Sequence, residues 1–241
     1  MPTILITGAA SGLGAAFVSA YQSQPNTKVF AIDISPIKTS HPNVQAHTLD
    51  LTNEPSVLSL ATDLPNQPID LIIHSAGIRG LVPALEDQYP NNVAACETLS
   101  GMDLETLTRT FQINTVATFS LLRALLPNLQ LAEQPKVIVM SSRMGSLAKN
   151  AVPNATAGSA YAYRASKAAL NMIVRSFAVD VPGVVWVLCH PGRGETGLVR
   201  GREEGAIAPE ESVRGILPLI ERWGESDSGK YYDRFGVVIP W

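Results

Sequence analysis

The sequence predicts a single α/β domain built on a doubly wound parallel sheet of about seven strands, with helices on both faces. Short apolar runs alternate along the chain with longer segments of helical periodicity, and this alternation is typical of βαβ units. Several of the runs are apolar nearly throughout, as strands are when helices cover both faces of a sheet. Because the 241 residues show no break in composition, we expect residues 1–241 to form one domain.

The positions of the strands, helices and loops follow from these runs. We expect strands at residues 3–6, 29–32, 44–47, 69–74, 136–140, 184–189 and 237–239. We expect helices at residues 13–22, 55–63, 104–126 and 160–181. Three long segments rich in Gly, Pro or Asn follow expected strands, and they are predicted to be ligand loops: residues 78–101, 145–159 and 192–209. Because loops after parallel strands gather at the carboxyl edge of the sheet, that edge is the expected binding site.

Composition argues against several classes of partner and site. A net charge of −3 provides no basic field for nucleic acid or an anionic membrane. No apolar run approaches the roughly 18 residues that span a bilayer, and the chain enters a strand-like run without a basic leader, so we expect a cytoplasmic protein. Cys96 and Cys189 are too few for a disulfide framework. Neither they nor the four histidines show metal-ligand spacing, so no metal site is predicted.

A glycine-rich turn, TGAASGLG at residues 7–14, follows the first expected strand and precedes a helix. Glycines here allow a tight turn and a close approach to a pyrophosphate, while the helix offers free N–H groups and the positive end of its dipole. A glycine pattern alone is a weak signal, and a plain loop is the alternative. The strand–turn–helix position favours a dinucleotide site in a Rossmann fold. Its predicted residues are Gly8, Ser11, Gly12, Leu13 and Gly14.

Two acidic residues end the second and third expected strands. Asp33 lies 19 residues after Gly14, where a carboxylate can accept hydrogen bonds from the adenosine ribose and repel a 2′-phosphate. The glycine turn contains no Lys or Arg, and the first base after Asp33 is Lys38, so NAD is favoured over NADP. A simple strand-end role for Asp33 is the alternative. Asp50 is a candidate acceptor for the adenine amino group, and a turn-forming role is nearly as well supported.

Tyr163 and Lys167 stand four residues apart in an expected helix, so their side chains lie along one face. A neighbouring cation favours the phenolate and lowers the pKa of a tyrosine toward neutrality, so Tyr163 could give a proton to a carbonyl or take one from an alcohol. The Tyr-x-x-x-Lys pattern alone is common, and a packed tyrosine beside a solvated lysine is the ordinary alternative. Tyr161, six residues from Lys167, lies on another face.

Together, these motifs resemble those of the short-chain dehydrogenase/reductase family, in the family's order and over essentially all 241 residues. Residues 7–14 are similar to its TGxxxGxG turn, and residues 74–77, HSAG, to its Asn-Asn-Ala-Gly turn. The chain looks most like the carbonyl-reductase-like and C-factor-like branch. The resemblance implies four catalytic residues: Asn114, Ser142, Tyr163 and Lys167. The cofactor contacts that it implies beyond the glycine turn and Asp33 are Asp50, Leu51, Ser75, Ala76, Gly77, Tyr163, Lys167, Pro191, Gly192, Gly194 and Thr196.

The resemblance also implies an activity. We expect an NAD(H)-dependent oxidoreductase that interconverts an alcohol and a ketone or aldehyde, with Tyr163 as general acid–base and a homodimer or homotetramer as the assembly. Ser142 would donate a second hydrogen bond, Lys167 would bind the nicotinamide ribose, and Asn114 would hold a helix kink and a water. The adjacent Ser141 would point away if the segment is extended. A dinucleotide-binding sensor or scaffold, and a non-redox enzyme acting on a specialised metabolite, stay open as alternatives.

The chain departs from the family pattern in two places. His74 and Ser75 replace the usual asparagine pair, which removes the amide groups that tie that turn together. Arg193 and Gly194 stand where a bulky residue and Val or Ile are usual, which makes the position of the nicotinamide less certain. The composition of the three loops indicates no particular substrate.

Overall fold

Alternate residues of the central strand pack on opposite faces of the sheet. The computed structural model describes residues 1–151, 159–194, 198–200 and 205–241. In β1 (Thr3–Thr7), Ile4 and Ile6 belong to one hydrophobic core and Leu5 to the other. Successive side chains of a strand point to opposite faces. This strand is therefore apolar on both faces because both are covered, as its sequence predicts.

Seven parallel strands form one sheet in the described part of the chain, in the order β3–β2–β1–β4–β5–β6–β7. Leu5 pairs with Phe30 on one side and with Ile72 on the other. The order changes direction between β1 and β4, which is where sheets of this kind bind ligands. The strands that follow β1 are β2 (Lys28–Asp33), β3 (Val44–Thr48), β4 (Leu71–His74), β5 (Lys136–Met140), β6 (Val185–His190) and β7 (Lys230–Asp233).

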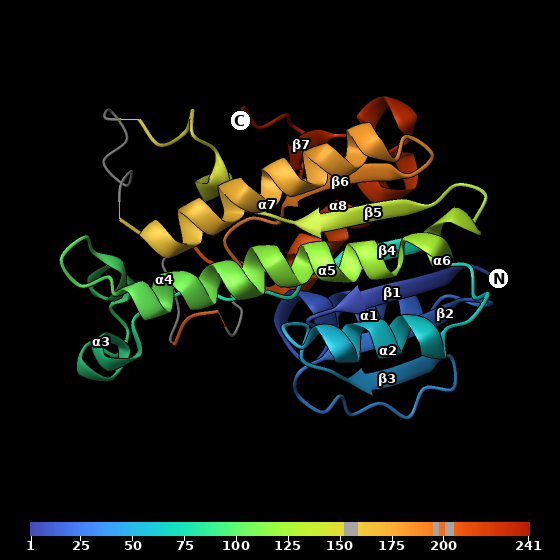
Figure 1. Ribbon diagram of the computed structural model, residues 1–241, viewed down its shortest axis with the longest axis horizontal. Helices are drawn as coiled ribbons and strands as arrows, with labels where there is room; N and C mark the ends of the chain where they lie inside the picture. The colour runs from blue at the N-terminus through green and yellow to red at the C-terminus, as the bar shows by residue number, and fades with distance from the viewer. Residues whose placement is uncertain (152–158, 195–197, 201–204) are drawn as a thin grey trace.

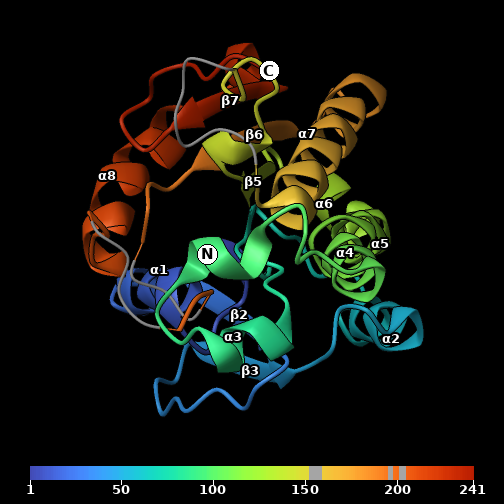
Figure 2. The ribbon, with the colours of Figure 1, turned by 90° about the vertical axis from the view of Figure 1, so that its left-hand side faces the viewer.

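Helices cover both faces of the sheet, and the two layers are seen on either side of it in Figures 1 and 2. One layer contains α1 (Gly12–Gln22) and α8 (Pro209–Arg222). The other contains α2 (Glu54–Asp63), α5 (Ala117–Ala124), α6 (Leu126–Gln130) and α7 (Tyr161–Asp180). The strand arrows in Figure 1 point toward the side that carries α3 (Pro83–Gln88) and α4 (Leu104–Phe111). Among the described residues, no helix is long and apolar enough to cross a bilayer.

The helix expected over residues 104–126 is divided. After α4, residues Gln112–Val116 form the π-helical turn η2, and α5 then resumes the α-helical geometry. A π turn contains one residue more than an α turn, and such turns are frequent at functional sites. Asn114 lies in it. Apolar periodicity predicts the whole helix but does not reveal the extra residue.

Helices α3, α6 and α8 are missing from the sequence prediction. Helix α8 begins with a proline, carries Glu210 and Glu211 in its first turn, and buries Val213 and Ile216; this start signal was readable, although Pro218 inside the helix argued against it. The segment 78–101, expected to be a loop, contains α3 and the 3-10 turn η1 (Val93–Glu97). Short elements of this kind give too little periodicity to be recognised.

The last strand was placed wrongly. The sheet ends in β7 (Lys230–Asp233), in which Tyr231 and Tyr232 are buried, whereas Val237 and Val238 are each 61% exposed. The chain turns back at Gly236, whose φ is +82°, and only an antiparallel bridge from Tyr232 to Val238 follows. The Val-Val-Ile run has strand composition but lies outside the parallel sheet.

Asn128 holds α6 against the segment that follows α2. Its buried amide donates to the carbonyl oxygens of Leu64 and Gln67, at 2.8 and 2.9 Å. The backbone carbonyl oxygen of Asn128 accepts from Ile69 N at 3.1 Å. Asn128 therefore satisfies the backbone groups of the connection that leads into β4.

Replacing Asn128 by Ala should lower the free energy of unfolding by about 2–3 kcal/mol, because two carbonyl groups lose their donor. Urea denaturation at neutral pH measures this change. Gln130→Ala, at an exposed position of the same helix, serves as the control and should change stability by roughly 0.5 kcal/mol or less. Equal effects of the two substitutions would contradict the assigned role.

Candidate active site

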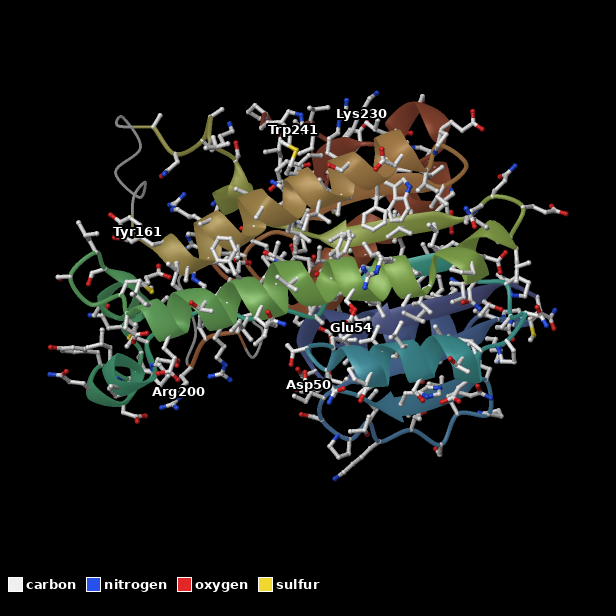
Figure 3. All side chains as sticks on the ribbon, in the orientation of Figure 1. Asp50, Glu54, Tyr161, Arg200, Lys230 and Trp241 are labelled. Carbon is white, nitrogen blue, oxygen red and sulfur yellow. The ribbon has the colours of Figure 1, made fainter. Side chains whose placement is uncertain are left out.

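One cleft at the carboxyl edge of the sheet brings the predicted site residues together. It encloses about 1100 Å³. Figure 3 labels Asp50, which lines the cleft, and Tyr161 at the start of α7, which does not. Gly14 and Asn114 do not line the cleft, and Thr196 lies outside the described residues. The predicted residues that do line it are Gly8, Ser11, Gly12, Leu13, Asp33, Asp50, Leu51, Ser75, Ala76, Gly77, Ser142, Tyr163, Lys167, Pro191, Gly192 and Gly194.

The glycine turn is shaped by close approaches that only glycine permits. Gly8 has φ +67°, and a Cβ there would lie 2.9 Å from Ala76 N in the turn after β4. A Cβ at Gly14 would lie 2.0 Å from the carbonyl oxygen of Gly8. Gly14 therefore acts by packing the helix against the turn. The first turn of α1 carries no acidic residue, and the side chain of Ser11 makes no capping bond, so this helix end fits an anionic group such as a pyrophosphate.

Two carboxylates, at the end of β2 and shortly after β3, line the cleft. Asp33 accepts from Ala10 N through Oδ2 at 2.9 Å and from Ser35 N through Oδ1 at 2.8 Å. These bonds to backbone N–H groups hold the carboxylate at the end of β2. Asp50 accepts from the backbone N and hydroxyl of Thr52 through Oδ1, at 2.8 and 2.7 Å. Asp50 thus forms a turn and also lines the cleft.

His74 ties the glycine turn to α5. Its Nδ1 lies 2.9 Å from Thr7 Oγ1 and its Nε2 lies 2.8 Å from Thr118 Oγ1. Thr118 donates its own proton to the carbonyl oxygen of Asn114, at 3.0 Å. Nε2 must therefore carry the ring proton and Nδ1 must accept from Thr7. Thr7 Oγ1 in turn accepts from Ser75 N and Ala76 N, both at 3.2 Å. The imidazole thus ties together the turn that the usual asparagine pair would hold.

His74 is neutral in the folded protein. Burial, and secondarily the charge of Lys167, lower its pKa to about 3. The hydrogen bonds agree with this direction, because a second ring proton would confront the hydroxyl proton of Thr7.

Asn114 joins the turn after β4 to α7 from its place in the π turn. Its Oδ1 accepts from Ile78 N at 2.8 Å, and its Nδ2 donates to Ile78 O at 2.9 Å and to Ser166 Oγ at 3.0 Å. A Cβ at Gly77 would lie 2.9 Å from Asn114 Oδ1 and 3.7 Å from Lys167 Nζ. Glycine at this position therefore leaves the space that the side chains of Asn114 and Lys167 border.

Tyr163 and Lys167 are both nearly buried, and their side chains lie together on α7. Lys167 Nζ is 5.8 Å from the centroid of the Tyr163 ring and donates to the carbonyl oxygen of Met140 at 2.9 Å. Burial lowers the pKa of Lys167 to about 8, so it is largely cationic at neutral pH. The pair therefore places a positive charge beside a phenol at the wall of the cleft.

The two adjacent serines have different partners. Ser141 also lines the cleft, but its hydroxyl donates to Oδ1 of the buried Asn171 at 2.6 Å. Ser142 accepts from Met144 N at 3.2 Å, at the start of the 3-10 turn η3 (Arg143–Gly145). The hydroxyl proton of Ser141 is thus committed to the core, which favours Ser142 as the donor toward a ligand.

The segment after β6 also lines the cleft. Gly192 has φ +93°, and a Cβ there would lie 3.3 Å from side-chain atoms of Arg234 and Ile207. Gly194 forms a backbone bridge with Ile207, and Ile207 N donates to Arg193 O at 2.9 Å. Backbone pairing thus fixes this segment without the bulky residue that the family pattern usually has.

Sequence reasoning misses most of the charged residues of the cleft wall. Arg164 was recognisable because it follows Tyr163 directly. Arg79, only two residues after Gly77, offered a similar signal, whereas its partner Glu97 is revealed only by the fold. The charged lining residues not predicted as site residues are Arg79, Glu97, Arg109, Arg143, Lys149, Arg164 and Arg193.

Comparisons with known proteins agree with this geometry. The sequence matches the family model described as short chain dehydrogenase over residues 2–206. It is 38% identical over 185 residues to the C-signal of Myxococcus xanthus, covering 76% of this chain and 99% of that protein. It is 30% identical over 199 residues to 1-hydroxy-2-glutathionyl-2-methyl-3-butene dehydrogenase of a Rhodococcus species, covering 80% and 78%.

Solved structures show the same relationship. The NADPH-bound carbonyl reductase from chicken fatty liver is similar with a TM-score of 0.85 and 27% identity, covering 100% of this chain and 94% of that one. The carbonyl reductase Sniffer of D. melanogaster has a TM-score of 0.80 and 26% identity, covering 100% of both chains. The fold and cleft define an oxidoreductase of the class that binds a nicotinamide dinucleotide. The chain belongs to the short-chain dehydrogenase/reductase family.

His74 should make stability depend on pH. Its folded pKa lies below the ordinary value near 6.5, so the unfolded state binds a proton that the folded state does not. Its contribution is complete above about pH 6.5 and is lost as the pH falls toward 3, by up to about 1.4 kcal/mol per pH unit. His74→Asn should therefore flatten the fall in unfolding free energy between about pH 7 and 4, measured by urea denaturation.

His41→Asn, the same replacement at an exposed position, is the matched control for the substitution. Curves for His74→Asn and the original protein that run parallel across the range would show that His74 is not the titrating group.

Proposed function

We propose that this protein is an NAD(H)-dependent oxidoreductase that interconverts an alcohol and a ketone or aldehyde, with Tyr163 as general acid–base. The observation that carries the proposal is that Ser142, Tyr163 and Lys167 line the same cleft as the glycine turn. A dinucleotide-binding sensor has no physical need for a phenol beside a buried lysine. A non-redox step by the same residues is the other reading, and turnover assays distinguish the two.

The chain's own groups suit carbonyl reduction. The nicotinamide dinucleotide, when bound, supplies the hydride for the carbonyl carbon. Negative charge then develops on the carbonyl oxygen, which Ser142 stabilises by donating a hydrogen bond and Tyr163 neutralises by donating its proton. The cation of Lys167, held at Met140 O, stabilises the phenolate that remains. Alcohol oxidation uses the same groups in reverse.

The residues behind the cleft support a route for replacing that proton. Asn114 fixes Ile78 through both its oxygen and its nitrogen, and Gly77 leaves open the space that Asn114 and Lys167 border. A water bound at Ile78 O could pass a proton to Lys167 and from there to Tyr163. Asn114 is in this proposal a positioning residue.

Preference for NAD rests on Asp33. Two backbone N–H groups hold its carboxylate at the edge of the cleft, where the charge would repel a 2′-phosphate. The similar carbonyl reductase from chicken fatty liver binds NADPH, so the cofactor of this chain has to be tested directly.

Tyr163→Phe should abolish proton transfer and lower turnover by roughly 10²–10⁴, while NADH binding survives. Cofactor absorbance during turnover of a panel of carbonyls and alcohols, and fluorescence titration with NADH, give the two readouts. Tyr161→Phe is a close control because this tyrosine lies in the same helix and is 40% exposed. Undiminished turnover in Tyr163→Phe would refute the proposed mechanism.

The original protein should bind NADH more tightly than NADPH, and Asp33→Ser should raise the affinity for NADPH by roughly tenfold or more, because it removes like-charge repulsion. Paired titrations with the two reduced cofactors measure the ratio. Asp180→Asn, an exposed change at the far end of α7, should leave the ratio unchanged. A preference for NADPH in the original protein would overturn the assignment of Asp33.

A further inference from the structure

A second cation besides Lys167 lies against the ring of Tyr163. The guanidinium carbon of Arg79 is 4.8 Å from the ring centroid, closer than Lys167 Nζ at 5.8 Å. A cation within about 6 Å of an aromatic centroid is attracted to the ring. Arg79 therefore contacts the residue that is proposed to transfer the proton.

Glu97 fixes the orientation of this guanidinium. Arg79 Nε lies 2.8 Å from Glu97 Oε2 and Nη2 lies 2.8 Å from Oε1, so the contact is bidentate. The two side chains are only 14% and 8% exposed. Arg79 Nη1 also lies 3.1 Å from the sulfur of Met144, which follows Ser142 in the 3-10 turn. A buried planar pair of this kind allows the guanidinium little rotation.

The pair also links separate segments of the site. Arg79 follows the cofactor turn at Gly77, whereas Glu97 ends the 3-10 turn η1. The carbonyl oxygen of Glu97 accepts from Ala160 N at 2.8 Å. Ala160 precedes α7 with φ +50°, a left-handed conformation that costs energy for a residue with a Cβ. Glu97 thus supports the start of the helix that carries Tyr163.

Several charged and titratable groups surround Tyr163 among the described residues. Lys167 and Arg164 come from its own helix, Arg79 from the turn after β4 and Glu97 from η1. Tyr231 of β7 interacts electrostatically with Tyr163, and Arg143 and Lys149 line the same cleft.

The charge balance in this group is positive near Tyr163. Burial and the charge of Arg79 lower the pKa of Arg164, while Glu97 raises it. The guanidinium groups of Arg79 and Arg164 therefore both interact with the single carboxylate of Glu97.

We propose that Arg79, held by Glu97, is a positioning residue that orients the Tyr163 ring and stabilises its phenolate. The inference rests on the proposed role of Tyr163 in proton transfer. It makes opposite predictions for the two members of the pair. Loss of Arg79 removes a positive charge from the ring, whereas loss of the Glu97 charge leaves the same positive charge without its counter-ion.

The ionisation of Tyr163 tests this without any substrate. Tyrosinate absorbance is followed against pH, and subtracting the curve of the matching Tyr163→Phe protein isolates the one residue. Arg79→Met should move the midpoint up by roughly 0.5–1 pH unit and Glu97→Gln should move it down. Arg79→Lys, which keeps the charge, should restore most of the midpoint.

The matched control is another Arg–Glu pair whose arginine lies over an aromatic ring. Arg123 contacts Glu54 at 2.6 Å and lies 5.3 Å from the Phe119 ring, but both charged side chains are 54% exposed. Arg123→Met should leave the Tyr163 midpoint in place. The double change Arg79→Met with Glu97→Gln removes both charges, leaves no buried charge unpaired, and should bring the midpoint back toward its original value.

The pH profile of alcohol oxidation gives the second readout. If a substrate is found, the rising limb of kcat should shift up in Arg79→Met and down in Glu97→Gln, with KM for the cofactor unchanged. Midpoints that stay fixed, or that move in the same direction in both variants, would overturn the role of Arg79. Absence of turnover in the original protein would instead refute the proposed function, while the absorbance titration would still judge Arg79.

Discussion

The buried amide of Asn114 is the interaction on which the site depends. From one side chain it holds the backbone of Ile78, in the segment after β4, and the hydroxyl of Ser166, on the helix of Tyr163 and Lys167. A regular α-helix from residue 104 onward would present a different residue at this point, so the π turn and the amide belong together. The segment after β4 and helix α7 are positioned relative to each other through this contact.

A buried lysine is the second constraint. Lys167 is 5% exposed and its ammonium group meets the carbonyl oxygen of Met140. A desolvated cation repels further positive charge, which is part of the reason that neighbouring His74 stays neutral. The same field favours a phenolate at Tyr163. One buried charge thus influences both His74 and Tyr163.

Much of the fold and of the candidate site could be predicted from the sequence, because the motifs depend on the spacing of residues that are near one another in the chain. The glycine turn, Asp33 and the Tyr163–Lys167 pair are recognisable since each motif lies within one strand–turn–helix unit or one helix. The parallel sheet follows from apolar runs that are buried on both faces. The extra residue of the π turn and the role of His74 were not predictable, because both depend on partners such as Thr118 and Ile78 that only the fold brings near.

Valine-rich composition misled at residues 237–239 for a related reason. Val237 has the composition of a strand, but the turn at Gly236 removes it from the sheet, and a parallel neighbour could not be reached in so few residues. Composition reports what a segment could pair with, and chain connectivity decides whether it does.

The bond between His74 and Thr7 has a consequence for how the protein is made. It joins residues 67 positions apart, and Thr118, which completes the bond to the other ring nitrogen, lies 44 positions further along. During synthesis, the glycine turn therefore leaves the ribosome before His74 and Thr118, which complete its hydrogen bonds, have been made. The first βαβ unit has to persist with an incomplete turn while the next segments emerge, and such long-range closure is a slow part of folding.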